Sequence, residues 1–106
     1  MPLVSVIMNC FNGERFLQKA IESIYSQTYA NWEIIFWDNA STDGSAIIAK
    51  SFDDKLRYFL APKMTPLGEA RNLALNKAKG KYVAFLDCDD LYFPHKIEKQ
   101  IQLMEK

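Results

Sequence analysis

Four short apolar runs, each followed by a segment in which apolar residues recur at helical spacing, constrain the fold more than any other feature of the sequence. The runs are rich in β-branched and aromatic residues, which is typical of strands buried on both faces. They cover Leu3–Met8, Trp32–Trp37, Leu56–Leu60 and Tyr82–Leu86. The spacing of the remaining apolar residues predicts helices over residues 16–25, 45–52, 66–79 and 94–104.

Strands that alternate with helices predict a parallel sheet with helices on both faces, joined by right-handed crossovers. We expect one domain over residues 1–106, because this length and a hydrophobic content of 49% suit a single core. The predicted fold class is α/β, a Rossmann-like three-layer αβα arrangement with strand order 3-2-1-4. In that order the connections after strands 1 and 4 diverge, and ligands bind in the crevice at the carboxyl ends of those strands.

The charge and residue composition exclude several classes of protein. Thirteen basic residues balance thirteen acidic ones, so a general nucleic-acid binder is disfavoured. No apolar run approaches the roughly 18 residues that a membrane span needs, and no basic region precedes the first apolar stretch, as a secretory leader would require. With only two cysteines, a disulfide scaffold or a zinc site is not expected. A reduced, cytoplasmic protein is the expectation.

An acidic cluster follows the fourth predicted strand, in the stretch Asp87-Cys88-Asp89-Asp90. Carboxylates held this close together repel one another, and a hard divalent cation such as Mg²⁺ or Mn²⁺ relieves that repulsion. The alternative is a solvated turn in which Asp90 caps the last helix. The cluster by itself does not decide between these interpretations.

A second polar cluster, Asp38 to Gly44, follows the second predicted strand. Asp38 lies at the rim of the expected crevice, where its carboxylate could accept hydrogen bonds from a ribose or a base. The alternative is that Asp38, like Ser41 and Asp43, only satisfies backbone groups of the loop.

Four other residues are candidates of lesser weight. Arg71 lies within an otherwise apolar helix stripe and could point its guanidinium into the crevice, or form a surface ion pair instead. Cys10 and Cys88 follow neighbouring strands, and we interpret them as two small buried thiols that lie near each other. His95, the single histidine, is interpreted as a surface or capping residue.

Taken together, these stretches resemble family 2 glycosyltransferases of the GT-A fold. The resemblance is spread over the whole chain, in order and at the family's spacings. It is carried by Val4 to Asn12, Ile24 to Tyr29, Trp32 to Gly44, Gly68 to Asn72, Ala78 to Tyr82, and Phe85 to Asp90.

The resemblance implies a donor site for a nucleotide-diphospho-sugar, UDP- or dTDP-linked, together with Mn²⁺ or Mg²⁺. By this carry-over Asn9 and Phe11 flank the nucleobase, and Asp38 bonds to it. Phe11 replaces a residue that is commonly Tyr in the family, so stacking is kept and a hydroxyl is lost. Arg71 holds base or phosphate, and Asp87 lies near the ribose. Asp89 ligates the metal as the second acid of the family's DxD motif.

The family's general base and most of its acceptor site lie beyond the DxD motif, in a second half that would take a saccharide or lipid-linked acceptor. No residue of this chain matches that base, so none is assigned as catalytic. The resemblance therefore covers the nucleotide-sugar-binding half. The fourth strand would then be an exposed edge of the sheet, which predicts pairing between chains. Whether the full-length protein docks on the inner face of a membrane is left open by the sequence.

Two alternatives are kept beside this interpretation. One is a binding module that holds a nucleotide-sugar without transferring it, or that needs a partner to supply the acceptor half. The other is a nucleotidyltransferase-like enzyme, which is weaker because the glycine-rich, basic phosphate loop it needs after strand 1 is missing. The sequence also lacks the GxGxxG pattern of dinucleotide sites.

Overall fold

The computed structural model describes residues 1–105, and its eight elements alternate strand and helix as expected. The strands are β1 (Val4–Cys10), β2 (Trp32–Asp38), β3 (Leu56–Leu60) and β4 (Tyr82–Phe85). The helices are α1 (Glu14–Tyr25), α2 (Ser45–Lys50), α3 (Leu67–Leu75) and α4 (Lys96–Met104).

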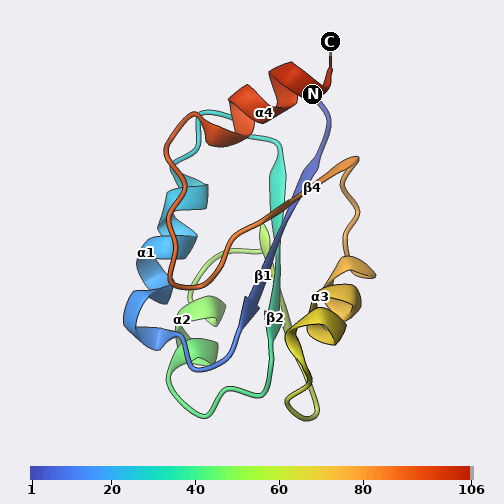
Figure 1. Cartoon of the computed structure of the whole chain (residues 1–106). Helices are drawn as coiled ribbons and strands as arrows, with labels where there is room; N and C mark the ends of the chain where they lie inside the picture. The colour runs from blue at the N-terminus through green and yellow to red at the C-terminus, as the bar shows by residue number, and fades with distance from the viewer. Residues whose placement is uncertain (106) are drawn as a thin grey trace.

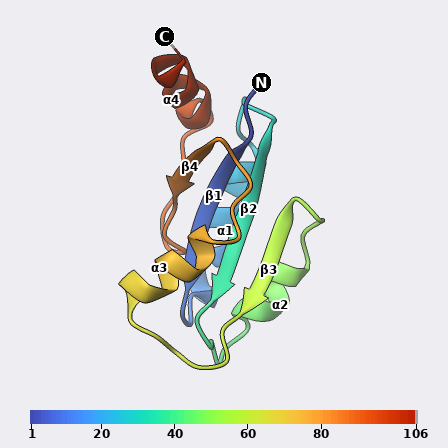
Figure 2. The ribbon, with the colours of Figure 1, turned by 90° about the vertical axis from the view of Figure 1, so that its right-hand side faces the viewer.

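The four strands form one parallel sheet in the order β3-β2-β1-β4, as predicted. In Figure 1, α1 and α2 lie on one side of the sheet and α3 on the other, while α4 crosses one end near both termini. Figure 2 shows the strands side by side, with β3 at one edge and β4 at the other. The arrangement is the expected three-layer α/β fold.

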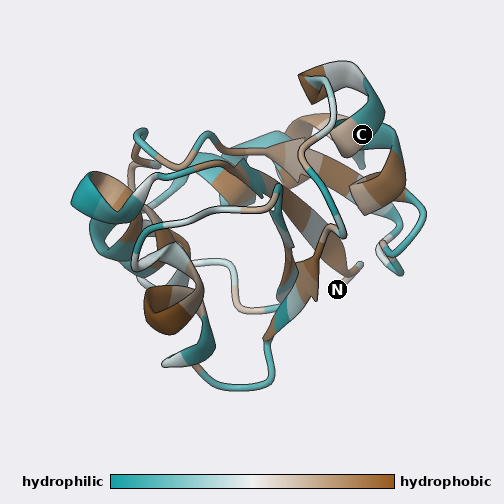
Figure 3. Ribbon diagram, turned by 90° about the horizontal axis from the view of Figure 1, so that it is seen from below, coloured by the Kyte–Doolittle hydropathy of each residue, from teal (hydrophilic) through white to brown (hydrophobic). Residues whose placement is uncertain are grey.

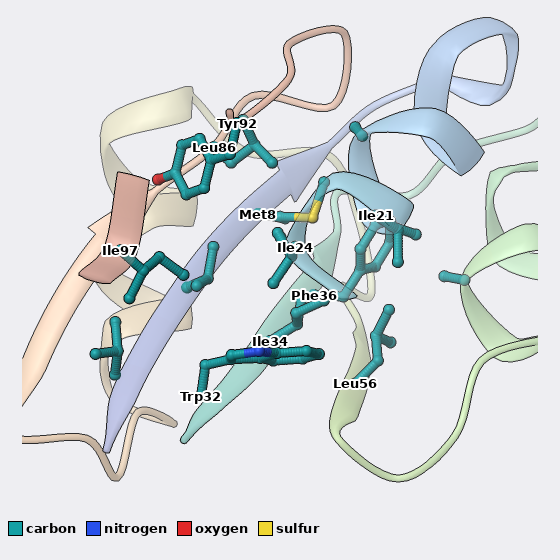
Figure 4. Packing of buried hydrophobic residues seen from close by; sticks show 14 of the residues in the cluster. Met8, Ile21, Ile24, Trp32, Ile34, Phe36, Leu56, Leu86, Tyr92 and Ile97 are labelled. Atoms are coloured by element: carbon teal, nitrogen blue, oxygen red, sulfur yellow. The ribbon is translucent and has the colours of Figure 1, made fainter. Parts of the chain in front are cut away.

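Alternate residues of the central strands separate the core into two clusters. Even-numbered positions of β1, such as Val6 and Met8, pack under α1 and α4, whereas Ile7 packs with Ala70 and Ala74 of α3. Figure 4 shows Met8 and Ile24 meeting in the larger cluster. Figure 3 shows brown, hydrophobic stretches along the strands, and both brown and teal stretches on the helices. No described helix is long and apolar enough to cross a membrane.

Several element boundaries differ from the sequence-based prediction. β1 continues through Asn9 and Cys10, where a turn was expected, because both residues pair with β2. α3 ends at Leu75, so Lys77 and Lys79 are not in its last turn. α4 begins at Lys96, which leaves Asp90 too far away to cap it; instead an Asp90 carboxylate oxygen accepts a hydrogen bond from the Leu91 amide.

Gly80 lies well beyond the end of α3 and is glycine for another reason. A Cβ at this position would lie 2.7 Å from the Ser5 backbone nitrogen and 2.8 Å from the Leu3 carbonyl oxygen. Its amide donates to the Ser5 hydroxyl at 2.8 Å. The connection between α3 and β4 therefore runs directly against β1, at the end of the sheet opposite the crevice.

Among the described residues, β4 pairs only with β1, so its other edge is open. Val83 and Phe85 on this strand are exposed, as are Leu91 and Phe93 in the segment that follows. This is the edge that was predicted from the sequence to pair with another chain. That pairing stays a prediction.

Candidate functional site

A cavity of about 500 Å³ opens where β1 and β4 end, at the position that the strand order predicts. One wall is formed by the loop after β1. The other is formed by residues 87–90 after β4, which we call the acidic turn. Leu67, at the start of α3, also reaches it. Four of the expected site residues, Asn9, Phe11, Asp87 and Asp89, line this one cavity.

Asn9 is the deepest of the four. It lies in β1 on the sheet face that carries α3, opposite Trp37 of β2. Its amide oxygen is buried and has no hydrogen-bond partner among the residues that the structure describes, and the same is true of the Trp37 indole nitrogen. Buried polar atoms in folded proteins are usually paired. This unpaired oxygen is the feature of the cavity that most directly calls for a donor group from a ligand or a water.

Phe11 forms the outer, apolar part of the wall. Its ring is 48% exposed, as is that of Phe16 from the first turns of α1. The guanidinium of Arg15 lies 5.1 Å from the centre of the Phe16 ring. Exposed aromatic faces at a cavity mouth suit the stacking of a planar ring.

The loop after β1 is tied to the loop after β2 by reciprocal hydrogen bonds. Asn12, whose φ is positive at 53°, receives the Thr42 amide on its side-chain oxygen at 2.7 Å, and its own amide donates to the Ser41 hydroxyl at 2.9 Å. A Glu14 carboxylate oxygen accepts from the Gly44 amide at 2.8 Å. These contacts fix the wall that carries Phe11 without any help from a ligand.

Asp38 does not line the cavity. Its side chain is fully buried, with one carboxylate oxygen accepting the Ser41 amide at 2.8 Å and the other accepting the Tyr58 hydroxyl. Burial, followed by this hydrogen bond to Asp38, raises the pKa of Tyr58. Asp38 thus bonds to a backbone group of the loop after β2, as the alternative interpretation expected. A contact between Asp38 and a nucleobase stays a prediction, and it would require this loop to open.

Arg71 lies on α3 and reaches toward the acidic turn. Its guanidinium nitrogen is 3.9 Å from an Asp87 oxygen, and both side chains are largely exposed, so the ion pair adds little stability. Arg71 lines a second cavity of about 380 Å³, which also contains Asp90 and Lys96. Asp87 borders both cavities, whereas Arg71 borders only the second and Asp89 only the first.

The acidic turn provides oxygen ligands but not a complete metal cage. Asp87 and Asp89 are exposed and line the same cavity. Within residues 1–105, no group of three or more His, Cys, Asp or Glu side chains is arranged to hold a metal ion. Mg²⁺ is commonly bound by one or two carboxylates with substrate phosphates and waters completing its shell. The donor set therefore fits a divalent cation that is bound together with a phosphate-containing ligand.

Cys10 and Cys88 lie together beneath the turn, as expected. A Cβ added to Gly13 would lie 2.9 Å from the Cys10 sulfur and 2.6 Å from the Cys88 sulfur, so the missing side chain of Gly13 leaves the space that both thiols fill. A hydrogen bond from Cys88 lowers the pKa of Cys10, whereas the contact with Cys10 and burial raise that of Cys88. Both are free thiols.

Five further residues that line the cavity had no site role assigned from the sequence: Asn12, Gly13, Arg15, Phe16 and Leu67. Asn12 belongs to the segment 9–12 expected at the carboxyl end of the first strand, and Asn is a residue type that favours turns with positive φ. Phe16 was assigned to the buried helix stripe, but its ring is half exposed at the cavity mouth. His95 stands at the N-cap position of α4, but its side chain makes no cap hydrogen bond; it is exposed, with its Nδ1 atom 3.2 Å from the Thr28 hydroxyl, as the surface interpretation expects.

Comparison with known proteins decides the family. The model of glycosyl transferase family 2 matches residues 5–106, almost the whole chain. The chain belongs to glycosyl transferase family 2. A nucleotidyltransferase-like assignment is therefore not retained. Among curated members of family 2, the chain is similar to a putative glycosyltransferase, EpsE, of Bacillus subtilis, with 45% identity over 109 residues. That alignment covers 99% of this chain and 39% of EpsE.

A second family 2 relative carries a more specific name. It is UDP-Glc:alpha-D-GlcNAc-diphosphoundecaprenol beta-1,3-glucosyltransferase WfgD of Escherichia coli, 38% identical over 98% of this chain and 42% of its own length. The chain thus spans about two fifths of the length of these two relatives.

Solved structures show the GT-A fold that this chain shares. TarS 1-349 of S. aureus in complex with UDP superposes with a TM-score of 0.91 and 25% identity, over 96% of this chain and 32% of that one. A mannosyltransferase of Pyrobaculum calidifontis, PcManGT, in complex with GDP-Man and Mn²⁺ gives a TM-score of 0.79 and 30% identity, over 86% of this chain and 28% of that one. The four-stranded sheet with its helices is therefore the N-terminal part of a family 2 GT-A fold.

Proposed function

We propose that the chain is the donor-binding part of a glycosyltransferase. It would bind a UDP- or dTDP-sugar with Mn²⁺ or Mg²⁺, for transfer of the sugar to an acceptor hydroxyl in polysaccharide or glycoconjugate synthesis. The observation that carries this proposal is the convergence of Asn9, Phe11, Asp87 and Asp89 on one cavity at the carboxyl ends of β1 and β4. The proposed location is the cytoplasm.

The apolar and polar parts of the cavity would contact different parts of the nucleotide. Phe11 would stack against the nucleobase, and the unpaired Asn9 oxygen would accept a hydrogen bond from the nucleoside. Asp87 would accept from ribose hydroxyls, while Arg71 beside it would bind base or phosphate. Asp38 would reach the base only after exchanging one of its two internal hydrogen bonds.

The acidic turn is where the cation would be held. Asp89 would be its protein ligand, and the diphosphate would complete the site, as the incomplete donor set requires. When bound there, the cation supplies positive charge that stabilises the leaving diphosphate. Two similar solved structures support the proposal of a nucleotide diphosphate bound with a cation, because TarS is in complex with UDP and PcManGT is in complex with GDP-Man and Mn²⁺.

The transfer step also needs a general base for the acceptor hydroxyl. We assign none among the described residues. The part of the relatives that this chain does not match is the place where we expect the base and the acceptor site. A saccharide or lipid-linked acceptor is therefore proposed for the longer protein, and the alternative is a module that holds the nucleotide-sugar for a partner carrying the other half.

Calorimetric titration with UDP, with and without Mn²⁺, tests the site. We expect binding that requires Mn²⁺, and a loss of about tenfold or more in affinity for Asp89→Asn. Asp90→Asn is the matched control, because it removes the same charge from the next residue, which borders the second cavity and not the first. Equal UDP affinity in wild type and Asp89→Asn would contradict the proposed metal ligand.

A second measurement separates donor binding from transfer. The chain is incubated with UDP-glucose and Mn²⁺, and release of UDP is followed. We expect tight UDP binding with no turnover above the uncatalysed rate. Turnover by the chain alone, abolished in Asp89→Asn, would overturn the assignment of the base to the part of the relatives that this chain does not match.

A further inference from the structure

The two cysteines lie at the same end of the sheet, Cys10 as the last residue of β1 and Cys88 in the turn three residues after the end of β4. Ile7 of β1 is opposite Phe85 of β4, and the Leu86 amide still donates to the Ile7 carbonyl at 3.1 Å. Each cysteine lies three residues beyond this last paired position of its segment. Adjacent strands lie about 4.8 Å apart, and a disulfide needs Cα atoms about 4.4–6.8 Å apart. The two segments therefore leave the sheet at a spacing that a disulfide can bridge.

The side chains also point to one place. Both sulfurs lie within 3 Å of the position where a Cβ of Gly13 would stand, at 2.9 Å for Cys10 and 2.6 Å for Cys88. No side chain of Gly13 separates them. Two thiols that share one space can be bridged without a large movement of either strand.

Cys10 and Cys88 differ in their access to solvent, and this difference determines which thiol reacts first with a small molecule. Cys10 is 1% exposed and its sulfur also contacts the Ser45 hydroxyl at 3.6 Å. Cys88 is partly exposed and lines the donor cavity between Asp87 and Asp89. A reagent that enters the cavity therefore meets Cys88 first, with Cys10 directly behind it.

We propose that Cys10 and Cys88 form a site of reversible intrachain disulfide formation, which ties the acidic turn to the end of β1. The co-reactant is a small-molecule disulfide such as glutathione disulfide. Cys88 attacks one of its sulfurs, loses its proton and releases one glutathione thiol. Cys10 then attacks the Cys88 sulfur, loses its proton and releases the second thiol. The two protein thiols are oxidised by two electrons, and the reagent is reduced to two thiols.

The disulfide should also affect nucleotide binding, because it lies beside the proposed donor site. This consequence rests on the proposed function. A sulfur–sulfur bond is about 2.0 Å long, much shorter than a non-bonded contact between two sulfurs. Forming it pulls Cys88 toward β1 and moves its neighbours Asp87 and Asp89 with it. Because a metal ligand tolerates little displacement, the oxidised form should bind UDP with Mn²⁺ more weakly than the reduced form.

The test is to treat the folded chain with glutathione disulfide and measure its intact mass. We expect a monomer that has lost the mass of two hydrogen atoms, returning to the original mass with dithiothreitol. Cys10→Ser is expected to stop at a glutathione adduct on Cys88. Ser45→Ala keeps both thiols while removing the hydroxyl beside Cys10, and it should still form the bridge.

Three results would overturn the site: a stable glutathione adduct on the wild-type chain, disulfide-linked dimers, or no reaction in the folded state when the urea-unfolded chain does react. UDP titration of the reduced and oxidised samples then tests the consequence, with an expected loss of about tenfold or more on oxidation. Equal affinities in the two forms would refute the effect on the donor site. If neither form binds UDP, the proposed function fails and the disulfide site stands on the mass measurement alone.

Discussion

Tyr58 donates its hydroxyl hydrogen to the buried carboxylate of Asp38, so a side chain of β3 holds the last residue of β2 in place. The other Asp38 oxygen holds the turn at Ser41, which in turn bonds to Asn12 at the cavity wall. A chain of hydrogen bonds thus runs from an edge strand to the wall that carries Phe11. The shape of the cavity depends on a pair of residues that lie outside it.

Tyr58→Phe should destabilise the protein by about 1–3 kcal/mol, because it leaves a buried carboxylate oxygen without its donor. Urea unfolding measures the change. Tyr82→Phe is the control, since the Tyr82 hydroxyl bonds to Glu105 at the surface and its removal should cost no more than about 0.5 kcal/mol. Equal losses in the two variants would show that the Asp38 contact has no special weight.

Ala40→Gly should stabilise the protein by about 0.5–1 kcal/mol. Ala40 has a φ of 63°, a conformation that costs an L-residue with a Cβ about 1–2 kcal/mol, and the gain is reduced by the greater freedom of glycine in the unfolded chain. Ala30→Gly, at an exposed alanine without positive φ, should be destabilising. Thermal or urea unfolding of both variants checks for this opposite sign.

Gly80→Ala should cost about 1–3 kcal/mol, because the added methyl would meet backbone atoms of Leu3 and Ser5 that cannot turn aside. Gly68→Ala is the matched control. No heavy atom lies within 4 Å of a Cβ at Gly68, which is in the first turn of α3, so alanine there should be neutral or stabilising by up to about 1 kcal/mol. A similar loss in both would point to a general intolerance of alanine.

Stability should fall in acid through Glu33. Burial by itself raises the pKa of Glu33, but hydrogen bonds from Ser5, the Lys79 amide and Arg57 outweigh it and hold this pKa below the ordinary 4.5. A depressed pKa contributes stability that is complete above the unfolded value and is lost as the pH drops through the folded value. Urea unfolding from pH ~6 to ~3 should therefore show a smaller acid loss in Glu33→Gln than in wild type. Parallel curves would contradict this.

Phe11→Ala should weaken UDP binding in Mn²⁺ by about tenfold, since stacking of a base on an aromatic ring contributes about 1–3 kcal/mol. Phe11→Tyr should bind at least as well as wild type. Phe16→Ala removes the other exposed ring of the cavity and should have the smaller effect. A larger effect at Phe16, measured in the same titration, would move the base to the α1 side of the cavity.

The layered architecture could be predicted because its signals are local. The β-branched runs and the helical stripes indicate the elements directly, and the rules of chain crossover leave few orders for four strands. Asp87 and Asp89 were also found this way, because parallel strands place their carboxyl ends at the same edge. Both expectations need only the order of elements along the chain.

Hydrogen bonds between residues far apart in the sequence determine the features that could not be predicted, the end of α3 and the partner of Asp38. α3 was expected to run to Lys79, but Arg57 donates to the Lys77 carbonyl at 2.7 Å, and Glu33 accepts the Lys79 amide at 2.8 Å. These contacts draw the chain out of the helix. The sequence left both interpretations of Asp38 open for a similar reason, because nothing local indicates that Tyr58, twenty residues away, is its partner.

The place of β1 in the middle of the sheet has a consequence for biosynthesis. β1 pairs on one side with β2 and on the other with β4, which is translated only after β2 and β3. Its second neighbour does not exist until Phe85 has been translated. Until then β1 has one bare edge and Asn9 lacks the opposite wall of its cavity, so the donor site can only be assembled after synthesis has passed the acidic turn.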